Sequence, residues 1–411
     1  MQNDLGFKFL LYSRISRSMA IIYMTLASPL YLSLINISLP NIGLIYFGIM
    51  LFSSILSLSL GFLGDRIGFR KALMISELPP IFGLFILWAT TNIYLITMAV
   101  IIGGIGGIAG GLRGSFSPGL SAFTANNYKD EKERVKKLSL LNRTSSIGSI
   151  IGAILLMMHS ILQSFFGGVY AYKILFLVAA FLMLISLISL YFVQENARPK
   201  KSTKIMKKES MRYVVRIAAL NALNGSGLGL SLPLLPLLFS IAFGLPKETT
   251  ALYIGLIYIP SYVATALGSH VAHKVRFKSG ILAVASRARM LGGFLLIVMG
   301  AVFAMQYLGI FTFLPLLGIA AFLYSARSFN AGIGSPSIIT VNIKGVHLED
   351  YGTASSIQGL SGTLSQSSIG AGGYLIEYAL PLPLFVGGAL QLAAGYLYPK
   401  LLGRYFEQIQ K

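Results

Sequence analysis

The chain has 411 residues, of which 55% are hydrophobic and only 11% are charged, and its mean hydropathy is +0.75. These values exclude an ordinary soluble globular fold, in which about 25% of the residues are charged. The net charge of +20 suggests nucleic-acid binding in a soluble protein, but in a membrane protein basic cytoplasmic loops are the commoner cause.

Apolar segments long enough to cross a bilayer follow one another along the chain. A bilayer core requires about 20 apolar residues per helix, and the alternating pattern of membrane strands is not seen. The sequence therefore predicts an all-α membrane protein with twelve transmembrane helices. The predicted spans are 18–38, 42–62, 72–91, 94–122, 138–160, 172–193, 213–240, 250–270, 281–304, 308–338, 352–377 and 380–402.

The basic residues predict the topology. The N-terminal stretch "MQNDLGFKFLLYSRISRS" has basic residues before an apolar run but no small-residue cleavage site, so we expect a retained first helix. With both termini in the cytoplasm, Lys and Arg residues fall in cytoplasmic segments or at cytoplasmic helix ends. The exceptions are Lys173 and Lys247 outside, and Arg113 and Arg327 within spans. We expect a multi-pass protein of the cell membrane.

A basic segment divides the chain near its midpoint. Residues 196–212, "NARPKKSTKIMKKESMR", predict a cytoplasmic linker between a six-helix bundle at 1–195 and another at 213–411. Anionic lipid headgroups are expected partners of such basic segments. Nucleic acid is not expected as a partner, and we expect a monomer.

Three weak matches between the halves, in the same order, indicate an internal repeat. "GFLGDRIGFRK" follows the second span and "GSHVAHKVRFK" the eighth. "LRGSFSP" in the fourth span matches "ARSFNAGIGSP" in the tenth, and "SSIG" occurs at 145–148 and 367–370. The repeat predicts two pseudo-symmetric six-helix bundles.

The loop "GFLGDRIGFRK" resembles the signature loop between spans two and three of the major facilitator superfamily, G-x-x-x-D-R-x-G-R-[RK]. Phe69 is inserted before the basic pair. The resemblance extends over twelve spans and the basic linker, and it implies the superfamily's fold and a transport function. The residues that occupy the motif positions are Gly61, Asp65, Arg66, Gly68, Arg70 and Lys71.

The resemblance implies that this loop is a conformational latch. A carboxylate at Asp65 would cap the helix that begins near 350–353, where the helix dipole is positive. The second copy has Ala272 at the Asp position and His273 at the Arg position, so the latch would act mainly from one half. The alternative is a short basic loop that only satisfies topology.

Charges within spans are costly, about 2.5–3.5 kcal/mol each, and therefore indicate function. Arg113 and Arg327 would suit an anion, because guanidinium binds carboxylate or phosphate in a bidentate manner. A conformational role and plain helix packing remain alternatives. Bends are expected at Ser28-Pro29 and "SLPLLP". Further substrate-binding candidates are Tyr23, Tyr31, Asn221, Asn224 and Asn330.

Candidates for proton coupling are Glu77 and Glu377, the two carboxylates within predicted spans, and His159. Both carboxylates lie near predicted span ends, where a snorkelling side chain is the alternative. No metal site is expected, since cysteine is absent and the four His are scattered. No cofactor is expected.

The sequence thus predicts a secondary transporter of a small organic solute, with an anion among the candidates, that works by alternating access. A proton-coupled multidrug efflux antiporter is the alternative, although the fifth-span "GSIIG" lacks the Pro and double Gly of that family's motif. Residues typical of an enzyme site are not found. A receptor would be expected to carry a sizeable extramembrane domain.

Overall fold

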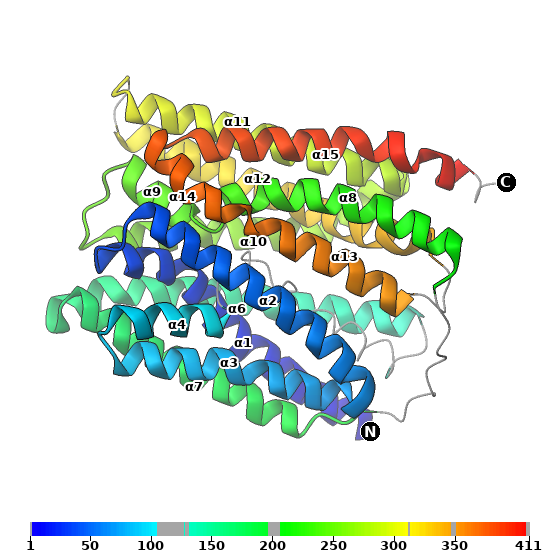
Figure 1. Ribbon diagram of the computed structural model, residues 1–411, viewed down its shortest axis with the longest axis horizontal. Coiled ribbons are helices and arrows are strands. Elements are labelled where there is room, and N and C mark those ends of the chain that lie inside the picture. The colour runs from blue at the N-terminus through cyan, green and yellow to red at the C-terminus, as the bar shows by residue number, and fades with distance from the viewer. Residues whose placement is uncertain are drawn as a thin grey trace. The chain divides into compact units, whose positions relative to one another are not determined.

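The computed structural model describes residues 2–104, 127, 131–195, 206–310, 313–346 and 351–407 (Figure 1). Every regular element in these ranges is a helix. The chain divides into two compact units. Unit 1 comprises residues 1–203 and 246–259, and unit 2 comprises 204–245 and 260–411. The domain boundaries derived from the sequence stay a prediction.

The helices of the first half begin with a long α1 that starts before its predicted span. α1 begins at Gln2, whereas its predicted span begins at residue 18, so the helix also includes the more polar N-terminal stretch. α4 ends at Gly103 with Gly104 in the left-handed conformation, φ 61°. The described helices are α1 (Gln2–Leu34), α2 (Leu39–Ile67), α3 (Phe69–Ala89), α4 (Ile93–Gly103), α6 (Glu131–Phe166) and α7 (Gly168–Tyr191).

In the second half, two predicted spans are broken helices. α8 ends at Ser231 and α9 begins at Leu235, so the bend expected at "SLPLLP" is confirmed, whereas α1 continues through Pro29. A short 3-10 turn separates α13 from α14. The elements are α8 (Lys208–Ser231), α9 (Leu235–Ala242), α10 (Thr250–Ser279), α11 (Ile281–Tyr307), α12 (Phe313–Lys344), α13 (Tyr351–Ser365), η2 (Gln366–Ser368), α14 (Ile369–Tyr378) and α15 (Leu382–Glu407).

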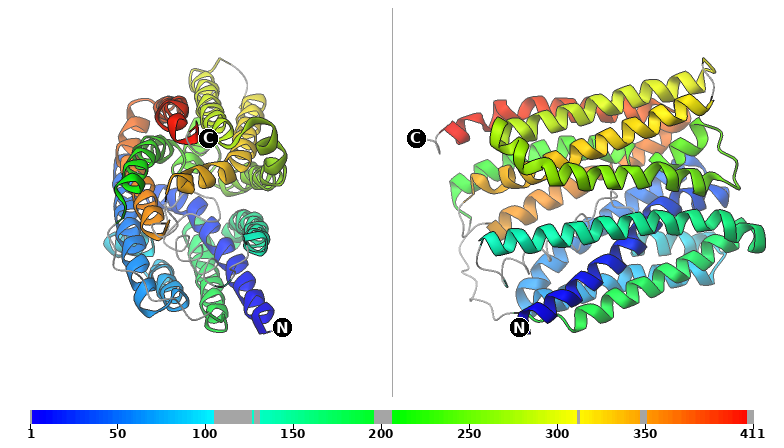
Figure 2. Two further views of the ribbon diagram at one scale, coloured as in Figure 1. Left: turned by 90° about the vertical axis from the view of Figure 1, so that its right-hand side faces the viewer. Right: turned by 180° about the vertical axis from the view of Figure 1, so that it is seen from behind.

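Small residues allow helices to approach closely in both units. In unit 1, α1 packs against α6 and α7, and α3 packs against α7 (Figures 1 and 2). A Cβ at Gly152 of α6 would lie 2.5 Å from the Met19 carbonyl oxygen, so only glycine fits there. The Ser18 and Ser145 hydroxyls join the same two helices at 2.8 Å. In unit 2, α11 packs against α12 and α15.

Seven of the described helical segments are long and apolar enough to cross a membrane. They correspond to predicted spans two, three and five to nine. The segments are Leu39–Ser57, Phe69–Ala89, Arg143–Phe166, Gly168–Tyr191, Lys208–Ala242, Thr250–Ala272 and Ile281–Tyr307.

Candidate functional site

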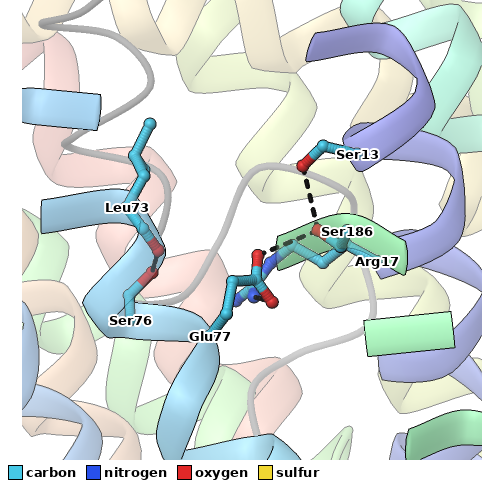
Figure 3. Close-up of polar contacts among 6 residues, drawn as sticks. All are labelled: Ser13, Arg17, Leu73, Ser76, Glu77 and Ser186. Carbon is cyan, nitrogen blue, oxygen red and sulfur yellow. Dashed lines mark hydrogen bonds and ion pairs between the residues drawn. The ribbon is translucent and has the colours of Figure 1, made fainter. Parts of the chain in front are cut away.

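A buried ion pair joins α1 to α3. Nη1 of Arg17 lies 2.8 Å from Oε2 of Glu77, and the Glu77 side chain has no exposed surface (Figure 3). Glu77 lies eight residues into α3 rather than at a helix end. The snorkelling alternative is therefore wrong for Glu77, because its carboxylate points into unit 1. A carboxylate in such a place requires a cationic partner, which Arg17 supplies.

Two serines extend the ion pair into a chain of hydrogen bonds. Ser186 of α7 donates to Oε1 of Glu77 at 3.1 Å, and the hydroxyls of Ser13 and Ser186 lie 2.9 Å apart (Figure 3). Each hydroxyl has one hydrogen. Since the Ser186 hydrogen goes to Glu77, Ser13 must donate to Ser186 when Glu77 is ionised. Ser76, also on α3, instead bonds the Leu73 carbonyl and is not part of the chain.

A second arginine belongs to the same cluster. Arg14 lies three residues before Arg17 on α1, and residues at this spacing share a helix face. Arg14 is buried and interacts electrostatically with both Arg17 and Glu77. The carboxylate of Glu77 therefore has one ion-pair partner, Arg17, and a second buried arginine, Arg14, close by on the same helix. We call Arg14, Arg17 and Glu77 the α1–α3 charge cluster.

Unit 2 contains a buried arginine with neutral partners. Arg289 of α11 donates from Nη1 to the Leu220 carbonyl at 3.2 Å and from Nη2 to Oδ1 of Asn221 at 2.8 Å. Its guanidinium carbon lies 4.3 Å from the ring centroid of Tyr398. These contacts join α11 to α8 and α15, and the cation–π contact compensates part of the buried charge.

Arg327, a predicted substrate-binding residue, is also buried in unit 2. Its Nη2 lies 3.4 Å from Oε1 of Gln391 on α15. Asn330, one turn further along α12, donates to the Ala288 carbonyl at 2.6 Å. Asn221 accepts a hydrogen bond from Arg289, so Asn221 and Asn330, two of the three candidate asparagines, bond groups of neighbouring helices in this structure.

Three candidates from the sequence meet in unit 1. The Tyr23 hydroxyl donates to the Tyr172 carbonyl at 3.3 Å. The Tyr31 ring lies 5.7 Å from the Tyr172 ring, and the His159 ring stacks on Tyr172 at 3.8 Å. Nε2 of His159 lies 3.0 Å from the Gly168 carbonyl oxygen, and because a carbonyl only accepts, Nε2 carries the hydrogen. These residues form an aromatic cluster between α1, α6 and α7.

The other candidates are dispersed. Arg113 lies outside the described residues, which leave out 105–126. Asn224 is half-buried on α8, and Glu377 is exposed on α14. Among the residues that the structure describes, no group of His, Asp and Glu is arranged to hold a metal ion. All the substrate and proton assignments stay predictions.

The signature loop is tied to the end of α7 by a residue that the sequence analysis missed. Glu195 accepts from the backbone N–H groups of Phe69 and Arg70 at 3.0 and 2.9 Å. Nη1 of Arg70 donates to the Val193 carbonyl at 3.2 Å. Glu195 therefore caps the N-terminus of α3, where the dipole and free N–H groups favour a carboxylate.

The rest of the loop is described in part. Gly68 precedes α3 with φ 109°, a conformation that favours glycine. Lys71 is exposed. The side chains of Asp65 and Arg66, and the environment of Gly61, lie outside the described set. The latch stays a prediction.

Arg14, Arg17 and Arg289 are the further site residues that sequence reasoning missed. It assigned them to cytoplasmic helix ends, whereas all three side chains are buried. The available signal was the spacing in "YSRISRS", where two arginines at i and i+3 directly precede an apolar run.

Long apolar helices with charged side chains buried between them define a multi-pass membrane protein. Residues 10–371 match the sequence model of the Major Facilitator Superfamily, so the chain belongs to this superfamily of transporters. The resemblance seen in the signature loop is confirmed, as is the all-α fold. Membership of a transporter superfamily also supports a transporter rather than an enzyme.

Several solved structures share the fold. The nucleoside transporter NupG is 12% identical, with a TM-score of 0.71 over 97% of this chain and 99% of that chain. An auto-inhibited POT family peptide transporter is 12% identical, with a TM-score of 0.72 over 97% of each chain. The human organic anion transporter MFSD10 is 14% identical, with a TM-score of 0.65 over 95% of this chain and 99% of that chain. No curated protein matches the sequence significantly.

Proposed function

We propose that the chain is a secondary transporter of a small organic anion and that it works by alternating access. The superfamily supports transport of a small solute, and the buried charges support an anion. Of the described side chains, four arginines are buried, at positions 14, 17, 289 and 327, whereas Glu77 is the buried carboxylate.

This excess of buried cations is the observation that carries the proposal. Each buried charge is costly unless it is compensated. Arg289 contacts a carbonyl, an amide and an aromatic ring, which carry no net charge. An anionic solute would complement such an interior, and guanidinium binds carboxylate or phosphate through paired hydrogen bonds. The likeness to an organic anion transporter is compatible with this substrate class, but it is a likeness of fold.

Transport by proteoliposomes tests the proposal. The panel contains organic anions together with neutral and cationic solutes of matched size, and it is run with and without a pH gradient. We expect uptake or exchange of at least one anion and weaker flux of the matched cation. No flux of any solute would contradict transport, and flux restricted to neutral or cationic solutes would contradict the anion.

The alternative, a proton-coupled efflux antiporter for drugs, has one favourable observation, namely the buried carboxylate of Glu77. The same proteoliposomes separate the two functions. Proton-driven movement of a cationic drug, with no anion flux, would favour the antiporter.

A further inference from the structure

We infer that the α1–α3 charge cluster is a carboxylate-exchange site, in which protonation of Glu77 releases Arg17 and Arg14 to bind the carboxylate of the transported anion. This inference rests on the proposed function and specifies its coupling. One proton and one carboxylate group would then move in the same direction.

The charge balance of the cluster supports exchange. With Glu77 ionised, two guanidinium groups and one carboxylate leave one net positive charge. If a proton neutralises Glu77 and a ligand carboxylate takes its place beside Arg17, the net charge is the same. The buried charge of unit 1 therefore does not change between the two states, so exchange adds no new cost of burying charge. Binding of the anion without the proton would remove the positive charge and leave two carboxylates in competition for the arginines.

The serine chain can accommodate both states of Glu77. In the ionised state Ser13 donates to Ser186, and Ser186 donates to Oε1 of Glu77. A protonated Glu77 becomes a donor, and the chain then reverses, with Glu77 donating to Ser186 and Ser186 to Ser13. The hydroxyl oxygen of Ser186 can therefore accept the hydrogen bond that a protonated Glu77 donates. A neutral Glu77 would keep a hydrogen bond at Oε1 while its other oxygen leaves Arg17.

The surroundings of Glu77 assign the titration to this one residue. The described charged groups that face it are Arg14 and Arg17 of α1. The remaining titratable side chains on the helices packed against α3 either lie near a helix end or bond elsewhere. They are Tyr46 of α2, which lies beside Ser28; Tyr94 of α4, which is exposed; and, on α7, Tyr170, Tyr172 and Lys173 in its first two turns and Tyr191 at its end.

The second repeat indicates that this exchange belongs to unit 1. Glu77 is eight residues after Phe69, the first residue of α3, and Arg289 is eight residues after Ile281, the first residue of α11. The position of the carboxylate in one repeat is therefore occupied by a guanidinium in the other. Among the residues that the structure describes, a proton site of this kind occurs in one repeat, and we therefore predict one proton per transport cycle.

Calorimetric titration with formate, the minimal carboxylate, tests the site in the purified full-length protein. Measurements at neutral pH in two buffers of different ionisation enthalpy give the protons taken up per formate bound. We expect uptake of about one proton by the wild-type protein. Glu77→Gln should bind formate about tenfold more tightly or better and take up no proton. Arg17→Gln should weaken binding at least about tenfold.

Controls separate binding from folding. The double variant Arg17→Gln/Glu77→Gln removes both charges of the ion pair, so its melting temperature reports whether loss of binding follows from loss of fold. Glu248→Gln changes an exposed carboxylate outside the cluster and should behave as wild type. Infrared difference spectra should show a protonated carboxyl band on formate binding to the wild type that is missing in Glu77→Gln.

The outcomes distinguish this inference from the proposed function. Formate binding without proton uptake in the wild type, equal proton uptake in Glu77→Gln, or no formate binding by either protein would overturn the exchange site. Organic anion flux that is insensitive to Glu77→Gln would also overturn it, while leaving the proposed function intact. Proton-linked formate binding without flux of any organic anion would overturn the proposed function and leave the site.

Discussion

Glu77 and Arg289 occupy the same position in the third helix of their repeats and carry opposite charges. Each connects its helix to the first helix of the same repeat, Glu77 through Arg17 and Arg289 through Leu220 and Asn221. The sixth helix contributes as well, through Ser186 in one case and Tyr398 in the other. Both repeats thus have a polar junction of their first, third and sixth helices. In the first repeat the buried arginine lies on the first helix, whereas in the second repeat it lies on the third.

The buried ion pair predicts non-additive effects on stability. Glu77→Gln leaves the guanidinium of Arg17 buried beside a neutral amide, and we expect a loss of about 3–5 kcal/mol. The double variant Arg17→Gln/Glu77→Gln should recover most of this loss, because both buried charges are gone. Thermal unfolding in detergent measures both. Equal destabilisation by the single and double variants would show that an unpaired Arg17 charge is not the cause of the loss.

Arg289 predicts a measurable coupling between α11 and α8. Its bond to Oδ1 of Asn221 involves a charged donor, and such bonds contribute about 1.5–3 kcal/mol. A double-mutant cycle of Arg289→Gln and Asn221→Ala should give a coupling energy in this range. Arg287→Gln changes an exposed arginine two residues away and should have little effect on stability. Additive effects of the two substitutions would contradict the junction.

The cap at α3 predicts local rather than global destabilisation. Glu195→Ala removes the acceptor for two backbone N–H groups, which should cost about 1 kcal/mol. Hydrogen exchange at the first turn of α3 should accelerate, while the middle of the helix remains protected. Glu195→Gln retains one acceptor oxygen and should have a smaller effect. Unchanged exchange in both variants would exclude Glu195 as the cap.

The crossing of α1 and α6 predicts a strong effect of a single methyl group. Gly152→Ala places a Cβ 2.5 Å from the Met19 carbonyl oxygen, so the helices must separate, at a cost of about 1–3 kcal/mol. Gly359→Ala on α13 is the matched control, since a Cβ there meets no atom within 4 Å. The melting temperature should fall only for Gly152→Ala. Equal melting temperatures would contradict the close crossing.

Arg327 predicts anion-dependent stability under the proposed function. A transported anion should raise the melting temperature of the wild-type protein, because a ligand that binds only the folded state stabilises it. Arg327→Ala should reduce this shift, while Arg287→Ala should leave it unchanged. An anion that stabilises Arg327→Ala and wild type equally would exclude Arg327 from the binding site.

The fold could be predicted from the sequence because the patterns that indicate it are either short motifs or averages over long segments. Apolar run length predicts the spans, and the loop around Gly68 carries the signature of the superfamily. The buried network was harder, because it depends on helices far apart in the chain. Glu77 contacts Arg17, sixty residues earlier, and Ser186, more than one hundred residues later. Hydropathy treats an arginine near the start of an apolar run as a helix end, so it could not place Arg17 inside the bundle.

The close crossing at Gly152 has a consequence for how the protein can be followed as it works. Because the α1 and α6 backbones approach closely at Gly152, where a Cβ would lie 2.5 Å from the Met19 carbonyl oxygen, we expect the two helices to move together as one body. Spin labels on their exposed faces, at Tyr12 and Ile147, should therefore report one unchanging separation under every condition. The distance between these two labels would then serve as the reference against which the displacement of any other helix is measured.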